Sequence, residues 1–334
     1  MTPDGRLRVV QIGGGPDSDY YLRAFVEIPS VADVVLVEPD AARREALAAR
    51  WGIVKRAVGN WREALADPAA DLAHVALPPA QAPAAARAAL AAGKHVILSG
   101  PGASSLADLD ALVQAAHQAR RQLFVSLPQL LHPAVERAAA LVEAGEIGEV
   151  HLAEVALLTA TPEAPPPGSG SARRAAEDTP PALGAAFDAL YVLQRLLGPA
   201  RAVVAARRGD CLGATLLLGK SALATLTVGP AEQGGRRREE RRLTGAQGTL
   251  LLRDDPEDEL PLVLLRGEEV LPLRVRCPLE VRPLYLARML AHFVDCLRQG
   301  RAPGVTLDQA RAALATALAV EEAATGGLRV TVSR

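Results

Sequence analysis

Residues 91–101, AAGKHVILSGP, decide the fold, because they pass from the end of a helical stretch into a short apolar strand and then into a turn. The β-rich run 95–99 is typical of a buried strand in a βαβ unit. Ligands of open α/β sheets bind just outside the carboxyl ends of the strands. Ser99, Gly100 and Pro101 therefore lie where a cofactor crevice is expected, although none of these three side chains is an acid or base that can exchange a proton near neutral pH.

The sequence on both sides of this segment repeats its alternation of β-rich runs and Ala/Leu-rich helical stretches. Parallel strands joined by helical crossovers give this pattern, so we expect an N-terminal Rossmann-type, doubly wound parallel sheet over residues 1–128. Asp40, Asn60 and Ser104 or Ser105 precede helical stretches as N-cap residues. The predicted strands are 7–12, 33–38, 71–77, 95–99 and 122–127.

Residues 129–334 predict a second domain of α+β type with a large, mainly antiparallel open sheet. Short β-compatible runs follow one another there, separated by turn residues, and helices are expected near 132–144, 183–197, 280–299 and 307–324. Residues 161–181 are rich in Pro, Gly, Ser and Ala and predict an irregular loop. The predicted strands are 150–160, 201–208, 212–218, 221–229, 238–243, 248–253, 262–266, 269–275 and 328–332.

The composition favours a small-molecule protein. At 334 residues the chain exceeds one ordinary hydrophobic core, so two domains with a cleft between them are expected. The net charge of −1 and the even spread of basic residues argue against nucleic acid or an anionic membrane as a partner. The first residues resemble no targeting segment, so we expect a cytoplasmic protein. Neither the three cysteines nor the histidines have metal-ligand spacing, so no metal is expected.

A glycine-rich turn follows the first predicted strand, in the context that a dinucleotide site requires. Gly13 would permit the tight turn and Gly15 the close approach of a pyrophosphate, while Ser18 stands in place of the third glycine. Glu38 ends the second strand, where a carboxylate accepts hydrogen bonds from ribose hydroxyls and repels a 2′-phosphate. The sequence therefore predicts NAD in preference to NADP.

Two carboxylates, Asp17 and Asp19, stand in the first turn of the helix after this loop. The exposed N–H groups of such a turn would hold phosphate, and a carboxylate can take the place of that anion. In the alternative interpretation Asp17 simply caps the helix. The sequence leaves both interpretations open.

Several motifs resemble the Gfo/Idh/MocA family of glucose-fructose oxidoreductase and inositol dehydrogenase over nearly the whole chain. This resemblance implies a Rossmann domain, nicotinamide-linked oxidation or reduction of sugar-like compounds, and dimer or tetramer contacts through the C-terminal sheet. The motifs are AGKHV at 92–96, IGEV at 147–150, LLGP at 196–199, LTGAQGTLLL at 243–252 and HFVDCLRQGRAP at 292–303.

The active-site residues that the resemblance implies are largely replaced. Where the family has Glu-Lys-Pro with a proton-carrying lysine, this chain has Ser99, Gly100 and Pro101. Lys55, Lys94 and Lys220 are the only lysines, and all three are predicted to be solvated.

The polar Thr-Pro-Pro of the family becomes Leu77, Pro78 and Pro79, and Ala82 and Leu130 replace a downstream His and an Arg. Leu77, Pro78, Ser99 and Gly100 are the residues expected to line the cofactor together with the glycine loop. The cofactor crevice is thus still expected at this place, but few of its side chains can donate or accept a proton.

Asp188 takes the place of the histidine acid/base of the family, and it is our candidate proton donor because a cleft can raise the pKa of a carboxyl group. Tyr191, one turn further on, can donate to a carbonyl, with core packing as the alternative. His132 suits the start of a helix better than a site. The run RRREERR at 236–242 is interpreted as a charged strand edge, not as a nucleic-acid patch.

Two hypotheses about function follow. In the first, the protein is an NAD(P)-dependent oxidoreductase acting on a sugar-like or other small carbonyl or hydroxyl compound, with Asp188, Tyr191 or water handling the proton. In the second, it is a non-catalytic relative that serves as a binding or partner subunit. Gly100, which replaces the lysine, is the feature that separates them.

Overall fold

The computed structural model describes residues 5–15, 17–159, 179–180, 182–233, 235, 237–254, 261–273, 275, 281–327 and 329–332. The chain forms two compact units. The first comprises the residues up to Pro128 together with Arg282–Arg311, and the second comprises Gln129 to Thr159, Pro180 to Val281 and the residues from Ala312 onward. The first unit thus includes a helical segment that the sequence-based division places in the second domain. The predicted loop 161–181 lies almost entirely outside the described residues.

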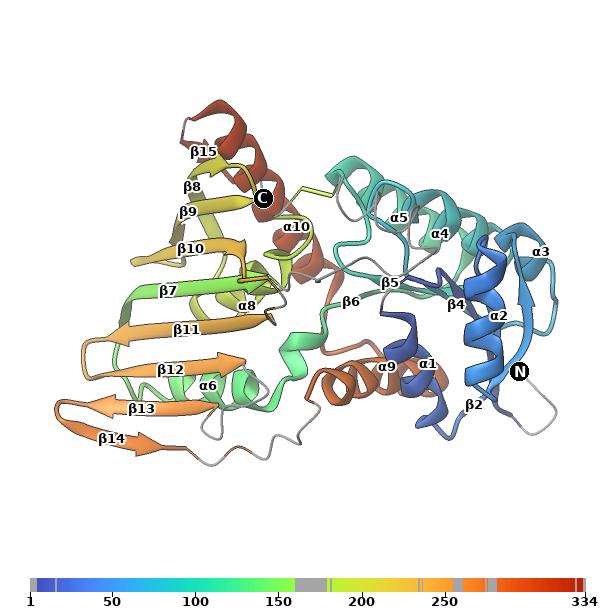
Figure 1. Ribbon diagram of the computed structural model, residues 1–334, viewed down its shortest axis with the longest axis horizontal. Helices are drawn as coiled ribbons and strands as arrows, with labels where there is room; N and C mark the ends of the chain where they lie inside the picture. Colours follow the sequence, from blue (N-terminus) through green and yellow to red (C-terminus); the bar gives the residue numbers. More distant parts are fainter. Residues whose placement is uncertain are drawn as a thin grey trace. The chain divides into compact units, whose positions relative to one another are not determined.

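The first unit is built on a six-stranded parallel sheet of strand order β3-β2-β1-β4-β5-β6, the doubly wound arrangement (Figure 1). Five of these strands are predicted from the sequence. The sixth, β3, was missed because it is a half-exposed edge strand of sequence VKRAV, which lacks a continuous apolar run. The strands are β1 (Leu7–Ile12), β2 (Val31–Val37), β3 (Val54–Val58), β4 (Leu72–Val75), β5 (His95–Ser99) and β6 (Leu123–Ser126).

Helices cover both faces of this sheet, with α4 and α5 above it and α1 and α9 below it in Figure 1. Asp40, Asn60 and Ser105 each accept a backbone N–H of the helix that follows, as the sequence predicts. α9 packs through Phe293, whose ring stacks on Phe124 of β6 at 4.7 Å. The helices are α1 (Ser18–Val26), α2 (Ala41–Arg50), α3 (Trp61–Leu65), α4 (Ala82–Ala91), α5 (Leu106–Ala119) and α9 (Val281–Gln299).

The second unit contains a nine-stranded sheet of order β14-β13-β12-β11-β7-β10-β9-β8-β15 (Figure 1). Among the strands that the structure describes, only β10 and β7 are parallel neighbours, so the sheet is mainly antiparallel, as predicted. The strands are β7 (Val150–Thr159), β8 (Ala200–Arg208), β9 (Cys211–Leu218), β10 (Ala222–Pro230), β11 (Arg238–Gly245), β12 (Gly248–Asp254), β13 (Leu262–Arg266), β14 (Glu269–Pro272) and β15 (Val330–Thr331).

Burial alternates along these strands, so one face of the sheet packs on the core and the other is exposed. The helical segments of the unit are η1 (Pro128–Leu131), α6 (Pro133–Glu143), α8 (Phe187–Leu197) and α10 (Leu307–Gly326), the first and last of which begin in the first unit. In the described ranges, no helix is both long enough and apolar enough to cross a lipid bilayer.

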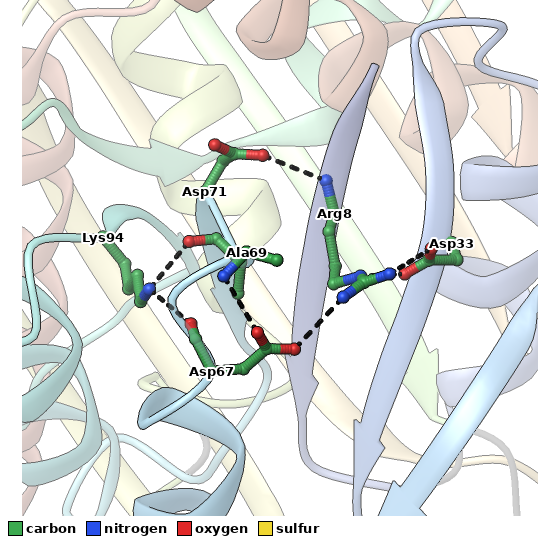
Figure 2. A network of polar contacts seen from close by, with 7 residues as sticks. Arg8, Asp33, Asp67, Ala69, Asp71 and Lys94 are labelled. Atoms are coloured by element: carbon green, nitrogen blue, oxygen red, sulfur yellow. Dashed lines mark hydrogen bonds and ion pairs between the residues drawn. The ribbon is translucent and has the colours of Figure 1, made fainter. Parts of the chain in front are cut away.

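Ion pairs and hydrogen bonds of charged side chains connect the amino ends of strands in the first unit (Figure 2). The Arg8 guanidinium bridges Asp33 at 2.6 Å and Asp67 at 3.3 Å. Lys94 is buried, contrary to the prediction that it is solvated, and its Nζ donates to the carbonyl oxygens of Asp67 and Ala70 at 2.7 and 2.8 Å. Burial lowers the pKa of Lys94. Because it precedes β5, at the end opposite to Ser99, Lys94 does not replace the lysine that the resemblance implies.

The charged run that the sequence suggested as a strand edge lies in the middle of the second sheet. β11 pairs with β7 on one side and β12 on the other. Glu239 and Arg241 point to the buried face, whereas Arg238 and Arg242 are exposed. The edge interpretation is therefore wrong for the described part of the run, since oppositely charged side chains pair inside the core.

Candidate dinucleotide site

The turn between β1 and α1 has the backbone that a close-packed glycine loop needs. Gly13 adopts a φ of +109°, and a Cβ there would lie 2.2 Å from the carbonyl oxygen of Ala76. A Cβ on Gly15, in contrast, would meet no atom within 4 Å. The loop therefore packs tightly against the carboxyl end of β4 at Gly13 and leaves the backbone of Gly15 open to an approaching ligand.

Ser18, which replaces the third glycine of the dinucleotide-binding motif, is hydrogen-bonded to the glycine loop. It is buried, its hydroxyl donates to the Gly13 carbonyl at 3.2 Å, and its backbone N–H donates to the Gly15 carbonyl at 3.0 Å. The side chain thus fastens the start of α1 to the turn. This departure from the fingerprint does not disturb the loop.

The two carboxylates near the start of α1 have different surroundings. Asp19 accepts from the indole Nε1 of Trp51 at 2.6 Å and pairs with Arg50 at 3.4 Å. Asp17 occupies the N-cap position of α1 and its carbonyl accepts from Tyr21 N at 3.2 Å, but its side chain makes no capping hydrogen bond. The charge of Asp19 is thus balanced by Arg50.

Glu38, just after β2, is buried and holds the glycine loop in place. One carboxylate oxygen accepts from Gly14 N at 2.9 Å and the other from Asp40 N at 2.8 Å. Arg43 lies 3.7 Å from the first oxygen. A carboxylate offers about four lone-pair positions, so Glu38 retains capacity to accept ribose hydroxyls as well.

A chain of hydrogen bonds runs from this loop to the carboxyl end of β5; we call it the serine–histidine chain and define it as Gln11, His74, Ser99 and Tyr21. Gln11 Nε2 donates to the Gly13 carbonyl at 3.1 Å, and Gln11 Oε1 lies 2.5 Å from His74 Nδ1. His74 Nε2 lies 3.1 Å from the Ser99 hydroxyl, which is 3.0 Å from the Tyr21 hydroxyl. The Tyr21 ring also packs edge-on against the imidazole.

The direction of these bonds follows from the amide of Gln11. Because its Nε2 faces the Gly13 carbonyl, its oxygen faces His74, so Nδ1 carries the proton and Nε2 accepts from Ser99. Ser99 has one hydroxyl proton, and Tyr21 must therefore donate to Ser99. Burial lowers the pKa of His74 to about 3, so the imidazole is neutral and this arrangement is fixed at neutral pH.

The other predicted cofactor residues surround the same sheet edge. Leu77 and Pro78 follow β4, and the nearest Leu77 atom would lie 3.4 Å from a Cβ on Gly13. Gly100 is exposed and donates its N–H to the Ser126 carbonyl at 3.2 Å. The structure thus groups Gly13, Gly15, Ser18, Glu38, Leu77, Pro78, Ser99 and Gly100 at the carboxyl ends of neighbouring strands.

Ser126 at the end of β6 was missed from the sequence. It pairs in register with Ser99, it is buried, and its hydroxyl has no hydrogen-bond partner. A buried hydroxyl of this kind calls for a partner. The only sequence signal is that two neighbouring parallel strands both end in serine.

The candidate residues of the second unit are held in α8 and at the start of α6. Asp188 is half-buried in the first turn of α8, and Tyr191 is buried with its hydroxyl accepting the backbone N–H of Gln129 at 3.0 Å. This matches the core-packing alternative for Tyr191. His132 caps α6, since its Nδ1 accepts from Ala134 N at 3.1 Å. Both Tyr191 and His132 thus have structural partners.

Residues 7–127 match the model of the GFO_IDH_MocA family, an oxidoreductase family with an NAD-binding Rossmann fold. An uncharacterized oxidoreductase of Rhizobium meliloti, ORF334, is 32% identical over 117 residues, which make up 35% of this chain and 35% of that protein. The match thus spans about a third of the relative's length.

Solved structures resemble nearly the whole chain, beyond the Gfo/Idh/MocA match. Levoglucosan dehydrogenase in complex with NADH has a TM-score of 0.84 at 18% identity, covering 98% of this chain and all of that one. Biliverdin reductase of Synechocystis, in complex with biliverdin and NADP+, has a TM-score of 0.80 at 24% identity, covering 96% and 99%. At these identities the likeness establishes the fold of both units.

Proposed function

We propose that this protein is a nicotinamide-dependent oxidoreductase that acts on a small carbonyl or hydroxyl compound. The observation that carries the proposal is the glycine loop, in which Gly13 packs tightly while Gly15 stays open at the start of α1. The unpartnered hydroxyl of Ser126 at the same sheet edge supports it, because a bound cofactor or substrate would satisfy that group. The residues present therefore fit a dinucleotide.

Each part of the loop has a role toward the cofactor. The N–H groups of the turn and of α1 would hold the pyrophosphate. Glu38 would accept the ribose hydroxyls, and its charge favours NAD over NADP. When bound, the cofactor supplies or accepts hydride. The serine–histidine chain fixes the Ser99 hydroxyl and ties the end of β5 to the loop.

The proton is assigned to Asp188 in this proposal, because no lysine stands at position 100 and Tyr191 is buried in the core whereas Asp188 is half-buried. A carboxyl group in a cleft can act as general acid. The missing lysine favours a reduction whose product is easily protonated over the oxidation of a simple alcohol. The presence of a biliverdin reductase among proteins of the same fold is consistent with that direction.

Titration with NADH, followed by fluorescence and calorimetry, tests the proposal. Gly15→Val should abolish NADH binding and leave the melting temperature unchanged, because the added side chain meets open space. Gly52→Val is the matched control, since Gly52 also has no atom within 4 Å of a Cβ and lies outside the loop. Equal NADH affinity in wild type and Gly15→Val would refute the cofactor site.

A second candidate function is that of a non-catalytic binding subunit. The exposed Gly100, which carries no side chain, favours it. NADH binding without turnover of any carbonyl compound would support this candidate. NADH binding together with turnover that Asp188→Asn removes would exclude it.

We also propose that two copies of the chain associate through the exposed face of the large sheet. Large apolar side chains gather there, including Leu217 and Leu223, which pair in register on β9 and β10. Arg242 lies between Glu154 and Glu240 on the same face, so a second copy would meet charges of both signs. Leu223→Glu should shift the protein to monomer in light scattering, whereas an unchanged mass would refute this interface.

A further inference from the structure

Two neighbouring strands of the first sheet, β5 and β6, both end in a serine; we call Ser99 and Ser126 the serine pair. They are partners in register. Partners in register on parallel strands point to the same face, and neighbouring strands lie about 4.8 Å apart. The two hydroxyl groups therefore stand side by side at the sheet edge where ligands of such folds bind.

The hydroxyl proton of Ser99 has a fixed direction. His74 Nδ1 lies 2.5 Å from Gln11 Oε1 and donates to it, so Nε2 of the buried, neutral imidazole accepts. Ser99 lies 3.1 Å from this Nε2 and gives it its one proton. A hydroxyl has two lone pairs, and Tyr21 donates to one of them. Toward a ligand, Ser99 can thus only accept, and it accepts one hydrogen bond.

The hydroxyl of Ser126 has the opposite capacity. It has no hydrogen-bond partner in the described part of the chain, and the residue is 3% exposed. Its backbone carbonyl accepts from Gly100 N at 3.2 Å, which ties the ends of the two strands together. A buried hydroxyl without a partner costs stability, so Ser126 has a proton to donate to a ligand that reaches this edge.

A ligand that satisfies the serine pair has to bring a donor for Ser99 beside an acceptor for Ser126. A primary carboxamide carries both on one carbon atom, an NH₂ group and a carbonyl oxygen. A carboxylate or a ketone carries acceptors alone and would face the remaining lone pair of Ser99. Ser99 is half-buried and Gly100 exposed, so this edge is open to a ligand on the side of β5.

We propose that the serine pair binds the carboxamide of the nicotinamide ring, with Ser99 accepting from the NH₂ group and Ser126 donating to the carbonyl oxygen. This inference rests on the proposed function, which supplies the dinucleotide. A carboxamide held at both atoms cannot turn about its bond to the ring. The serine pair thus selects the amide and determines which face of the ring meets the substrate.

The test compares two dinucleotides, NAD+ and its 3-acetylpyridine analogue, in calorimetric titrations. The analogue has a methyl ketone in place of the carboxamide, so it keeps the net charge and the carbonyl oxygen and lacks the N–H donors. Because one hydrogen bond distinguishes the two ligands, wild type should bind NAD+ about two- to tenfold more tightly than the analogue.

Each serine should affect these affinities differently. Ser99→Ala should abolish the preference for NAD+, whereas Ser99→Thr keeps a hydroxyl and should retain it. A general disturbance of the glycine loop would lower both affinities and leave their ratio unchanged. Ser126→Ala should lower both by the same factor, because both ligands carry the carbonyl oxygen. Ser30→Ala is the matched control, since Ser30 is a buried serine that precedes β2 at the amino end of the sheet.

The outcomes separate this proposal from the proposed function. Equal affinity for the two dinucleotides in wild type, or a preference that survives Ser99→Ala, would refute amide recognition, while the binding of NAD+ would still support an oxidoreductase. A changed ratio in Ser126→Ala would mean that Ser126 contacts the NH₂ group, and the assignment would be wrong. If neither dinucleotide binds, the cofactor site itself is refuted and both proposals fail.

Discussion

Two buried polar systems, one in each unit, differ in how completely their groups are paired. In the serine–histidine chain both nitrogens of His74 and the amide of Gln11 have partners. In the buried group of Gln129, Arg237, Glu239 and Arg241, which we call the arginine cluster, Arg241 Nε, Gln129 Nε2 and Glu239 Oε1 have no hydrogen-bond partner. A fully paired network stabilises and orients, whereas a partly paired one costs stability until something completes it. The first system therefore orients its groups, whereas the second lowers the stability of the free protein.

Removal of the central carboxylate of the arginine cluster should give the largest loss in the free energy of unfolding. Glu239→Ala removes the carboxylate that pairs with the buried Arg241 and leaves that charge buried, so the free energy of unfolding should fall by about 3–5 kcal/mol. Urea unfolding measures this. The double variant Glu239→Leu with Arg241→Met should cost much less, because the fully buried Arg241 charge is removed together with its partner and the remaining Arg237 is partly exposed. Equal losses in the two variants would show that the cluster matters only through packing.

The serine–histidine chain should make the free energy of unfolding depend on pH, because it contains the buried His74. The pKa of His74 is about 3 in the folded protein and about 6.5 when exposed, so the unfolded chain binds the extra proton as the pH falls between these values. Stability is therefore lost on going down from pH 6.5. Between pH 6.5 and 4.5 the loss due to His74 is about 2–3 kcal/mol.

His74→Gln isolates this contribution, because other groups titrate equally in both proteins. Wild type should lose stability more steeply than the variant in urea titrations at a series of pH values. Parallel curves would mean that His74 is protonated in the folded protein, and the bond directions derived for the chain would then be wrong.

Much of this architecture can be predicted from the sequence, because it follows from alternation of apolar residues and from turn chemistry. The strands of the second sheet, the caps Asp40, Asn60 and Ser105, and the strand–glycine–helix unit at Gly13 all follow local rules. β3 does not, since Lys55 and Arg56 are exposed on an edge strand and break the apolar pattern.

Pairing of polar groups across the fold cannot be predicted in this way. Lys94 and Arg241 look solvated in the sequence, but each finds partners that lie far from it along the chain. Tyr21 and Ser99 are 78 residues apart, and only the fold of the first unit brings their hydroxyl groups together. The candidate site was therefore predicted where it depends on backbone, at the glycine loop, and missed where it depends on side chains from separate elements.

Tyr21→Phe probes the outer end of the serine–histidine chain. It removes one hydroxyl, and Ser99 keeps His74 as its partner, so the free energy of unfolding should fall by about 0.5–1.5 kcal/mol. NADH affinity should be preserved, because the chain orients groups and does not bind the ligand through Tyr21. Urea unfolding and NADH titration measure the two quantities. A loss of NADH binding without a loss of stability would place the Tyr21 hydroxyl in the binding site itself.

Ser99 and Ser126 pair in register, and they allow a hydrogen-bonded hydroxyl to be compared with one that has no hydrogen-bond partner. Ser99→Ala removes partners from both His74 and Tyr21, and should cost about 1–3 kcal/mol because the imidazole is left with an unmet acceptor. Ser126→Ala removes a hydroxyl that has no hydrogen-bond partner, so the free energy of unfolding should stay within about 0.5 kcal/mol of wild type. NADH titration should nevertheless show weaker binding in Ser126→Ala, since the unpartnered hydroxyl is the one left for a ligand. If Ser126→Ala instead destabilises the free protein as much as Ser99→Ala, its hydroxyl is already paired in solution and the rule that separates orienting from binding groups fails in this unit.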